Sequence, residues 1–395
     1  MESLPQEIVL DIISRLPIQS LLQSKCVCRA WQCLIQDPVL VHKHLCRMEK
    51  NDPSIILQSD HPIDSELYLG VLSCQNDGNY NMITKKLPMP PLLRKFYLSG
   101  SSNGLICLLD SYQKLKPFIY NPFTGNYLDL PDLPKRHDTR ILGFGFAPTT
   151  KEYKVVELSF SPWVRFDQVD PPFEADVHVL TIGSPTWRNL GTVPFYFMRR
   201  KYNHHVLING KLHWVSHPTR NRTTNLIISF DLATEKFEEI PLPDCSSSNS
   251  NLAKEGFGQV AVLRGCLSAL CYEDENEQLE IWVMKEYGVK ESWSKEFSTG
   301  VFVPKIMLEQ EDPGSFFNSK YYLHQRQTGV LCLLRSGELL LEYRNKALGI
   351  YDPKCRIFRD VQFIFEGIPK FRAVLDHVTS LNWIDSTSLV NIANG

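Results

Sequence analysis

Residues 100–104 read Gly-Ser-Ser-Asn-Gly, a G-x-S-x-G pattern of the kind that presents a nucleophilic serine in hydrolases. That role requires a strand before the serine and a helix after it. The residues that follow, 105–109, form a short apolar run that favours a strand. We therefore predict that the two glycines form a hairpin turn and that the serine has no catalytic role.

Cysteines and histidines gather near the N-terminus, where a zinc site has to be considered. They are Cys26, Cys28, Cys33, His42, His44 and Cys46. The C-x-C spacing differs from the C-x2-C of common zinc sites. Cys28 and Cys33 also fall within an apolar helical pattern, where small buried thiols suit packing. We therefore predict no zinc site here.

The remaining candidate residues do not match a metal site or a nucleotide-binding site either. His213 and His217 are four residues apart on or beside a strand, a separation of roughly 13 Å that is too large for one metal ion. His204 and His205 would point to opposite faces of a strand. Gly143-Phe144-Gly145 lacks the third glycine and the helix of a dinucleotide site, and no P-loop is present. We expect no catalytic residue, metal or cofactor.

Composition limits the partners and the compartment. The net charge is -2 and no basic arm or tail appears, which argues against nucleic acid as a partner. Apolar runs are far shorter than the roughly 20 residues of a membrane span, and residues 2–7 do not resemble a signal peptide. We expect a protein of the cytoplasm or nucleus, with its 11 cysteines as free thiols.

The first 50 residues carry helical patterns. Ser3 and Gln6 match a capping box, with Pro5 in the first turn. Apolar residues then recur at helical spacing in three stretches, separated at Pro17 and ended by Asp37-Pro38. They are Ile8, Val9, Ile12, Ile13 and Leu16, then Ile18, Leu21 and Leu22, and last Val27, Ala30, Trp31 and Leu34. We predict a small all-α domain of three short helices whose remaining apolar surface needs a partner.

Residues 51–395 predict an all-β domain. Alternating runs such as Leu279, Ile281 and Val283 are typical of strands, and turn-forming residues separate them. Five hairpins carry a large apolar side chain on each arm: Tyr120 with Tyr127, Leu180 with Trp187, Phe230 with Phe237, Trp282 with Trp293, and Tyr351 with Phe358. Most follow a glycine-led strand pair, at Asn103-Gly104, Asn209-Gly210, Arg264-Gly265 and Ser336-Gly337.

Two hairpins per unit indicate the four-stranded blades of a β-propeller, with five such units along the chain. The runs at 54–58 and 67–73 are expected to pair with the C-terminal run at 373–381 and close the ring. A closed ring leaves no sheet edge exposed, which favours this arrangement.

The motifs of both parts resemble a known family. Leu4-Pro5-x-x-Ile8, Leu16-Pro17, Leu21-Leu22 and Cys26-Val27-Cys28-Arg29-Ala30-Trp31 resemble the F-box in order and spacing. The body resembles the F-box-associated, kelch-like domain of a large plant family, with motifs such as Tyr120-Asn121-Pro122-Phe123-Thr124-Gly125, Gly143-Phe144-Gly145-Phe146 and Asn209-Gly210-Lys211-Leu212-His213-Trp214. Gln23-Ser24 departs from the basic–aromatic pair common after the paired leucines, a change expected to weaken adaptor binding.

The resemblance implies an F-box over residues 1–50 and a kelch-like β-propeller over 51–395. It further implies the non-catalytic substrate-recognition subunit of an SCF-type cullin–RING E3 ubiquitin ligase. The F-box would bind a SKP-family adaptor, and through it the cullin and RING subunits, while the propeller would bind a target protein. Carried over from the motif, Leu4, Pro5, Ile8, Leu16, Pro17, Leu21, Val27 and Trp31 would form or support the adaptor face.

Three long segments of the body mix basic with aromatic or polar residues: 161–173, 199–205 and 217–224. Because propellers commonly bind partners through such loops, we predict a target-binding face that includes Trp163, Arg165, Arg199, Arg200 and Arg220. The acidic run 273–277 falls between two strands and predicts a solvated hairpin tip. Two alternatives stay open: an adaptor-binding scaffold without target degradation, and a propeller enzyme with a vestigial F-box.

Overall fold

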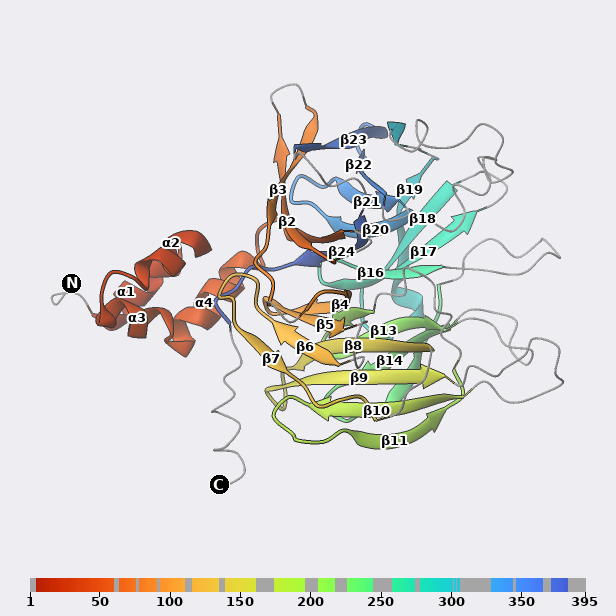
Figure 1. Cartoon of the computed structure of the whole chain (residues 1–395). Helices are drawn as coiled ribbons and strands as arrows, with labels where there is room; N and C mark the ends of the chain where they lie inside the picture. Colours follow the sequence, from red (N-terminus) through yellow and green to blue (C-terminus); the bar gives the residue numbers. More distant parts are fainter. Residues whose placement is uncertain are drawn as a thin grey trace.

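The structure is a computed structural model of the whole chain. The residues that it describes are 5–59, 64–75, 78–90, 93–110, 116–134, 139–160, 174–195, 205–216, 226–243, 258–273, 278–300, 302, 304–305, 328–343, 346–364 and 371–382. A helical head, residues 5–48, projects from one side of a larger β body, residues 54–382 (Figure 1).

The head contains four helices, α1 (Gln6–Ile13), α2 (Ile18–Ser24), α3 (Arg29–Ile35) and α4 (Pro38–Met48). The prediction of three helices missed α4, because Asp37-Pro38 was interpreted only as a stop signal. Asp37 is in fact the N-cap of α4, where its carboxylate accepts a hydrogen bond of 2.8 Å from the Val39 amide, and Pro38 occupies the first turn. Pro5 itself is the N-cap of α1, and Ser3 lies outside the described residues.

The body is a ring of six four-stranded blades, each a meander of neighbouring antiparallel strands. Blade 2 consists of β4 (Phe96–Ser102), β5 (Leu105–Asp110), β6 (Pro117–Tyr120) and β7 (Tyr127–Asp129). Blade 3 consists of β8 (Thr139–Ala147), β9 (Glu152–Phe160), β10 (Ala175–Thr181) and β11 (Arg188–Val193). Blade 4 consists of β12 (Val206–Ile208), β13 (Lys211–Ser216), β14 (Leu226–Asp231) and β15 (Phe237–Ile240). Blade 5 consists of β16 (Gln259–Leu263), β17 (Cys266–Glu273), β18 (Gln278–Met284) and β19 (Trp293–Thr299). Blade 6 consists of β20 (Thr328–Leu333), β21 (Leu339–Tyr343), β22 (Ala347–Asp352) and β23 (Ile357–Ile364). A 3-10 helix, η1 (Lys290–Ser292), precedes β19.

Blade 1 joins the two ends of the body. It is built from β1 (Ser54–Ser59), β2 (Leu67–Cys74), β3 (Tyr80–Lys86) and the C-terminal β24 (Phe371–His377). β24 pairs antiparallel with β1, which places Ser54 opposite His377 and confirms the predicted closure of the ring. This composite blade adds a sixth to the five units counted from the sequence. The outer strands β3 and β23 also pair, in parallel, so blades 1 and 6 form one eight-stranded sheet.

The repeated hairpins are present at the predicted positions. Tyr120 lies opposite Tyr127, and equivalent pairs occur in blades 4 and 6. In blade 5 Trp293 lies opposite Met284 and Trp282 opposite Lys295, so Trp282 and Trp293 share a hairpin without facing each other. Three of the four glycine-led turns are two-residue turns with positive φ at both positions, as at Asn103 and Gly104 (φ 50° and 81°), whereas the turn that contains Ser336 and Gly337 is longer and only its glycine has positive φ. Gly104 of the G-x-S-x-G segment is therefore in the β4–β5 turn, as predicted, whereas Gly100, predicted to be in the same turn, lies within β4 and pairs with Cys107.

Neighbouring blades pack closely where an inner strand carries glycine. A Cβ atom placed on Gly143 of β8 would lie 2.7 Å from Leu212 and from the ring of Trp214, both on β13 of the next blade. Trp214 is almost fully buried there. The Gly-Phe-Gly-Phe motif thus serves interblade packing, since any side chain at Gly143 would displace this ring.

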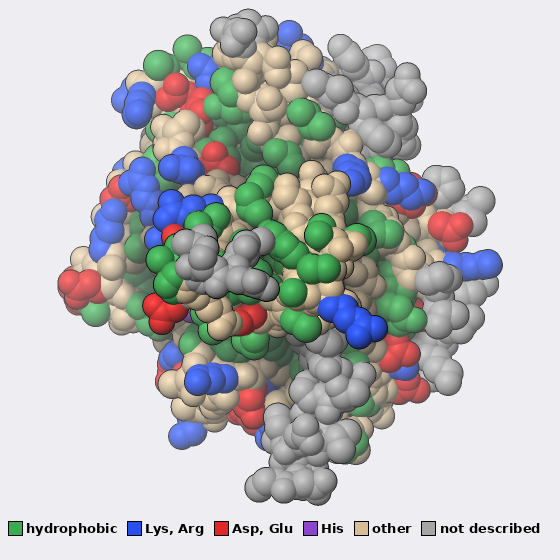
Figure 2. All heavy atoms as spheres, turned by 90° about the vertical axis from the view of Figure 1, so that its left-hand side faces the viewer, with side chains coloured by type: hydrophobic (Ala, Val, Ile, Leu, Met, Phe, Trp, Pro, Cys, Tyr) green, Lys and Arg blue, Asp and Glu red, His purple; other side chains and the backbone are tan. Residues whose placement is uncertain are grey.

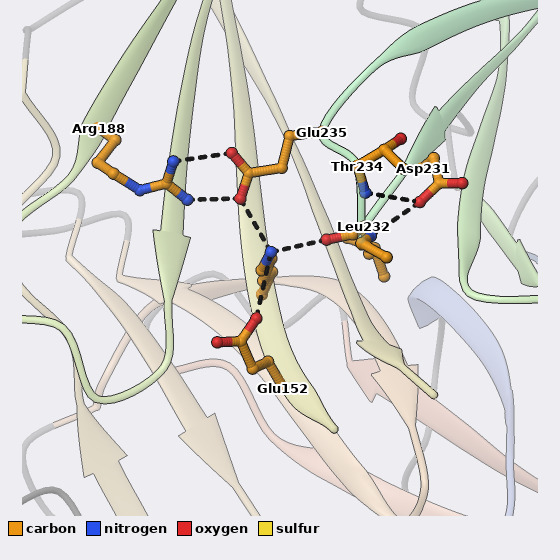
Figure 3. Close-up of polar contacts among 8 residues, drawn as sticks. Glu152, Arg188, Asp231, Leu232, Thr234 and Glu235 are labelled. Atoms are coloured by element: carbon orange, nitrogen blue, oxygen red, sulfur yellow. Dashed lines mark hydrogen bonds and ion pairs between the residues drawn. The ribbon is translucent and has the colours of Figure 1, made fainter. Parts of the chain in front are cut away.

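A polar network fastens blade 4 to blade 3 (Figure 3). Lys154 of β9 is buried and donates to the Leu232 carbonyl at 2.7 Å and to Glu235 at 2.9 Å. Arg188 of β11 makes a two-pronged contact with the same Glu235 carboxylate. Both cations lie on blade 3, whereas Leu232 and Glu235 form the β14–β15 turn, so the turn is held by charges on its neighbour.

Candidate functional site

The core of the head is small and is completed from the body. Six helical side chains are buried in it, namely Leu10, Ile13, Ile18, Leu21, Ile35 and Leu40. Leu381, which follows β24, is the seventh buried member, and Phe123 of the β6–β7 turn packs against the same cluster. The head and the body therefore share one apolar cluster, which sets how the helices sit on the propeller.

An ion-pair network fixes α1 against α4. Asp11 accepts hydrogen bonds from Arg15, just after the end of α1, and from Arg47 on α4, and Arg47 also donates to the Ser14 hydroxyl at 2.9 Å. The Arg15 contact, followed by the charge of Arg47, holds the pKa of the Asp11 carboxyl below its usual value. Asp11 is therefore ionised at neutral pH and the two helices keep one relative position.

Apolar side chains remain exposed on the head although its core is small. Ile8 and Ile12 share one face of α1, because they are one helical turn apart, and are 48% and 52% exposed. Val27, between α2 and α3, is 68% exposed, and Val39 on α4 is 51% exposed. In Figure 2, where the head faces the viewer, hydrophobic side chains gather near the centre of the view. These four side chains are therefore the candidate apolar surface of the head.

The residues carried over from the motif take three different places. Pro5, Ile8, Pro17 and Val27 are exposed. Leu16 and Trp31 are half-buried and pack against the head core. Leu21 is fully buried at its centre, so it can support the face only from beneath, and Leu4 lies outside the described residues.

Two exposed residues of this surface, Ile12 and Val39, were not among the predicted ones. Ile12 has the i, i+4 relation to Ile8 that could have indicated a shared face. Val39 was missed together with α4, since its stretch was interpreted as lying beyond the last helix.

The cysteines differ from the prediction in two respects. Cys28 and Cys33, expected to be buried, are exposed, because α3 packs on the core through Ile35 and turns these positions outward. Cys271 is disulfide-bonded, whereas the prediction was of free thiols throughout; nine other cysteines are free. Within the described part of the chain, no group of three or more His, Cys, Asp or Glu side chains is arranged to hold a metal ion.

The residues predicted to bind the target are not among those that the structure describes. Trp163, Arg165, Arg199, Arg200 and Arg220 all lie outside the described residues, as do His204 and His217. Glu273, the first residue of the acidic run, pairs with Gln278 of β18, which confirms a hairpin at this position; the rest of the run, residues 274–277, lies outside the described residues.

The body histidines His205 and His213 are both buried. His213 accepts or donates a 2.7 Å hydrogen bond with the Tyr287 hydroxyl, and burial lowers its pKa to about 4. His205 lies within 3.2 Å of both backbone groups of Phe144. Each is explained by packing between blades. Among the helices that the structure describes, none is long and apolar enough to cross a membrane.

Comparisons with known proteins agree with both parts of this architecture. Residues 1–48 match the F-box-like family, and residues 59–364 match the F-box associated beta propeller domain family. The chain is 36% identical to F-box protein At3g07870 of Arabidopsis thaliana, over 98% of this chain and 93% of that protein. It is 32% identical to F-box protein CPR1 (75% of this chain, 73% of that protein) and 29% identical to F-box/kelch-repeat protein At3g23880 (74% and 78%), both from the same plant.

A helical head with an exposed apolar face, a six-bladed body and a match over most of the chain lead to one assignment. The chain belongs to the plant F-box proteins in which an F-box is followed by an F-box-associated β-propeller domain.

Proposed function

We propose that this protein is the substrate-recognition subunit of an SCF-type cullin–RING ubiquitin ligase. In this proposal the head binds a SKP-family adaptor, which brings the cullin and RING subunits, and the propeller binds a target protein. The chain itself carries out no chemistry. It raises the effective concentration of target lysines near the ubiquitin-charged enzyme.

The observation that carries the proposal is the apolar face of the head. Ile8, Ile12 and Val27 are about half exposed or more, although the helices of the head bury seven other apolar side chains. Burial of such side chains stabilises a complex by about 25 cal/mol per Å². Pro5, Pro17 and Val39 extend the exposed surface, and the half-buried Trp31 provides an aromatic group of the kind enriched in binding hot spots.

The test is the binding of a purified plant SKP-family adaptor to the full-length chain by isothermal titration calorimetry. We expect Val27→Asp or Ile12→Asp to weaken binding by about thirtyfold or more, equivalent to about 2 kcal/mol, because a charge would be buried unpaired. Neither side chain belongs to the core, so both variants should keep the thermal midpoint of the parent chain.

Ile83→Asp is the matched control, since Ile83 is 51% exposed on β3 of the body. It should bind the adaptor as the parent chain does. Full affinity in both head variants, or no adaptor binding by the parent chain, would refute the proposed docking face.

Adaptor binding alone would not separate a ligase receptor from a scaffold. Proteins captured by the parent chain should therefore be compared with and without inhibition of cullin activation in plant cells. A receptor predicts that at least one captured protein accumulates under inhibition and also in cells that express Val27→Asp. Unchanged levels of every captured protein would favour the scaffold.

A further inference from the structure

The residues that follow the closing strand β24 also have a structural role. After β24 ends at His377, residues 378–382 run to the head, where Leu381 is 3% exposed within the cluster that contains Leu21, Ile35 and Leu40. We call residues 377–382 the C-terminal latch. A buried leucine contributes about 2 kcal/mol of transfer free energy, a large share of what a four-helix head can gather.

Hydrogen bonds hold the latch on blades 2 and 3. The Asn121 side-chain amide donates to the carbonyls of Ser380, at 3.0 Å, and of Asn382. Asn382 in turn donates to the Tyr153 hydroxyl at 2.6 Å and to the Asn103 carbonyl at 3.3 Å. These contacts come from the β4–β5 turn, the β6–β7 turn and β9, so the latch is fixed at several points of the body.

The fit between latch and body is close. A Cβ atom on Gly104 would lie 2.2 Å from the Cβ atom of Ser380, so the latch rests directly on the glycine of the β4–β5 turn. The rings of Phe123 and His377 stack, with centroids 6.1 Å apart and planes 8° apart, and Phe123 also packs against the head cluster. Phe123 therefore touches the latch on one side and the helices on the other.

A comparison of equivalent turns isolates the residue that serves the latch. Asn121, Asp231 and Asp352 each begin the turn of an outer hairpin, and each side-chain Oδ1 accepts from the amides two and three residues later. That role needs only an acceptor, which Asp and Asn both provide. Among these three side chains, only the amide of Asn121 adds a donor, and it donates to two carbonyls of the latch.

We infer that the C-terminal latch is a positioning device that locks the F-box onto the propeller in one orientation, with Asn121 and Leu381 as its positioning residues. With the latch in place, the head does not move freely relative to the propeller. The fold then sets the distance from a bound adaptor to the propeller. The consequence for ubiquitin transfer rests on the proposed function, but the lock itself does not.

Three full-length variants test the lock. Asn121→Asp keeps the turn acceptor and removes the latch donor, and Leu381→Ala removes the side chain from the head core. Asp352→Asn is the matched control, because it makes the opposite exchange at an equivalent turn with no latch beside it. Hydrogen exchange followed by mass spectrometry reports the helices and the blades separately, and small-angle scattering reports the placement of head against body.

We expect Asn121→Asp and Leu381→Ala to speed exchange in α1–α4 at least tenfold and to raise the radius of gyration, with blades 4 and 5 unchanged. Asp352→Asn should match the parent chain. Unaltered exchange and scattering in Asn121→Asp would overturn the inference, as would equal changes in the control. None of these readings requires an adaptor, so a failed lock and a failed ligase assignment can be told apart.

Discussion

The four helices of the head bury seven of their own apolar side chains, yet the head leaves Ile8, Ile12, Val27 and Val39 about half exposed or more. In the blades, the middle strands are buried along most of their length, and the charged β14–β15 turn docks on the neighbouring blade (Figure 3). The body is thus complete in itself through the ring, whereas the head depends on the latch within the chain and, as we propose, on an adaptor outside it. Two domains of one chain can therefore reach stability by opposite routes.

The largest expected effect is the loss of stability of the head when one buried leucine is replaced by alanine, compared with the same replacement in the body. Leu21→Ala in the head and Leu340→Ala in β21 each remove a fully buried leucine, at a cost of about 2–5 kcal/mol. The small head should lose its exchange protection at 25 °C, whereas the ring should only show a lower thermal midpoint. If Leu21→Ala left the helices protected, or exposed the blades together with them, the contrast between the two regions would be wrong.

Acid should destabilise the fold through two buried histidines, one in the latch between the regions and one inside the body. Burial lowers the pKa of His377, in the latch, to about 3, and that of His213 to about 4, from the usual 6.5. Below pH 6.5 the unfolded chain takes up protons that the folded chain does not, so unfolding is favoured. Each histidine contributes stability that is complete above pH 6.5 and falls by about 1.4 kcal/mol per pH unit toward its folded pKa.

Urea unfolding between pH 7.5 and pH 5 measures this dependence. His377→Gln should flatten the decline, because glutamine does not titrate and can still receive the 2.9 Å hydrogen bond that the ring makes with Ser101. A slope identical to that of the parent chain would show that His377 is not neutral in the folded state.

The smallest effect is expected at the surface of the body. Arg188 is 51% exposed, so its ion pair with Glu235 is screened by water, and Arg188→Ala should cost less than about 1 kcal/mol. Lys154→Ala should cost more, since Lys154 is buried and its loss leaves the Leu232 carbonyl without this donor. A larger loss for Arg188→Ala in chemical denaturation would reverse this ranking.

Features formed by residues close in the chain were the ones that the sequence could predict. The paired rings of the outer hairpins and the Asn103-Gly104 type of turn follow from strand period and positive φ, which are local properties. The pairing of β1 with β24 was predictable for another reason, that a propeller with open edges would be unfavourable.

The misses have physical causes as well. Asp37-Pro38 both ends one helix and begins the next, so one signal supported two interpretations. Cys28 and Cys33 lie in an apolar helical pattern, but the pattern does not show which side of α3 meets the core. The place of Leu381 in the head depends on a contact between the two ends of the chain, and no local pattern of residues carries that information.

The latch also has a consequence for how the protein is made. Ribosomes add residues in order, at about 5–20 per second, so the F-box helices emerge first and wait on the order of tens of seconds for Leu381. The strands β1 to β3 wait equally for β24. A nascent or prematurely terminated chain thus has neither a finished head nor a closed ring. The head and blade 1, which begin the chain, can therefore be completed only after its C-terminal segment has been synthesised.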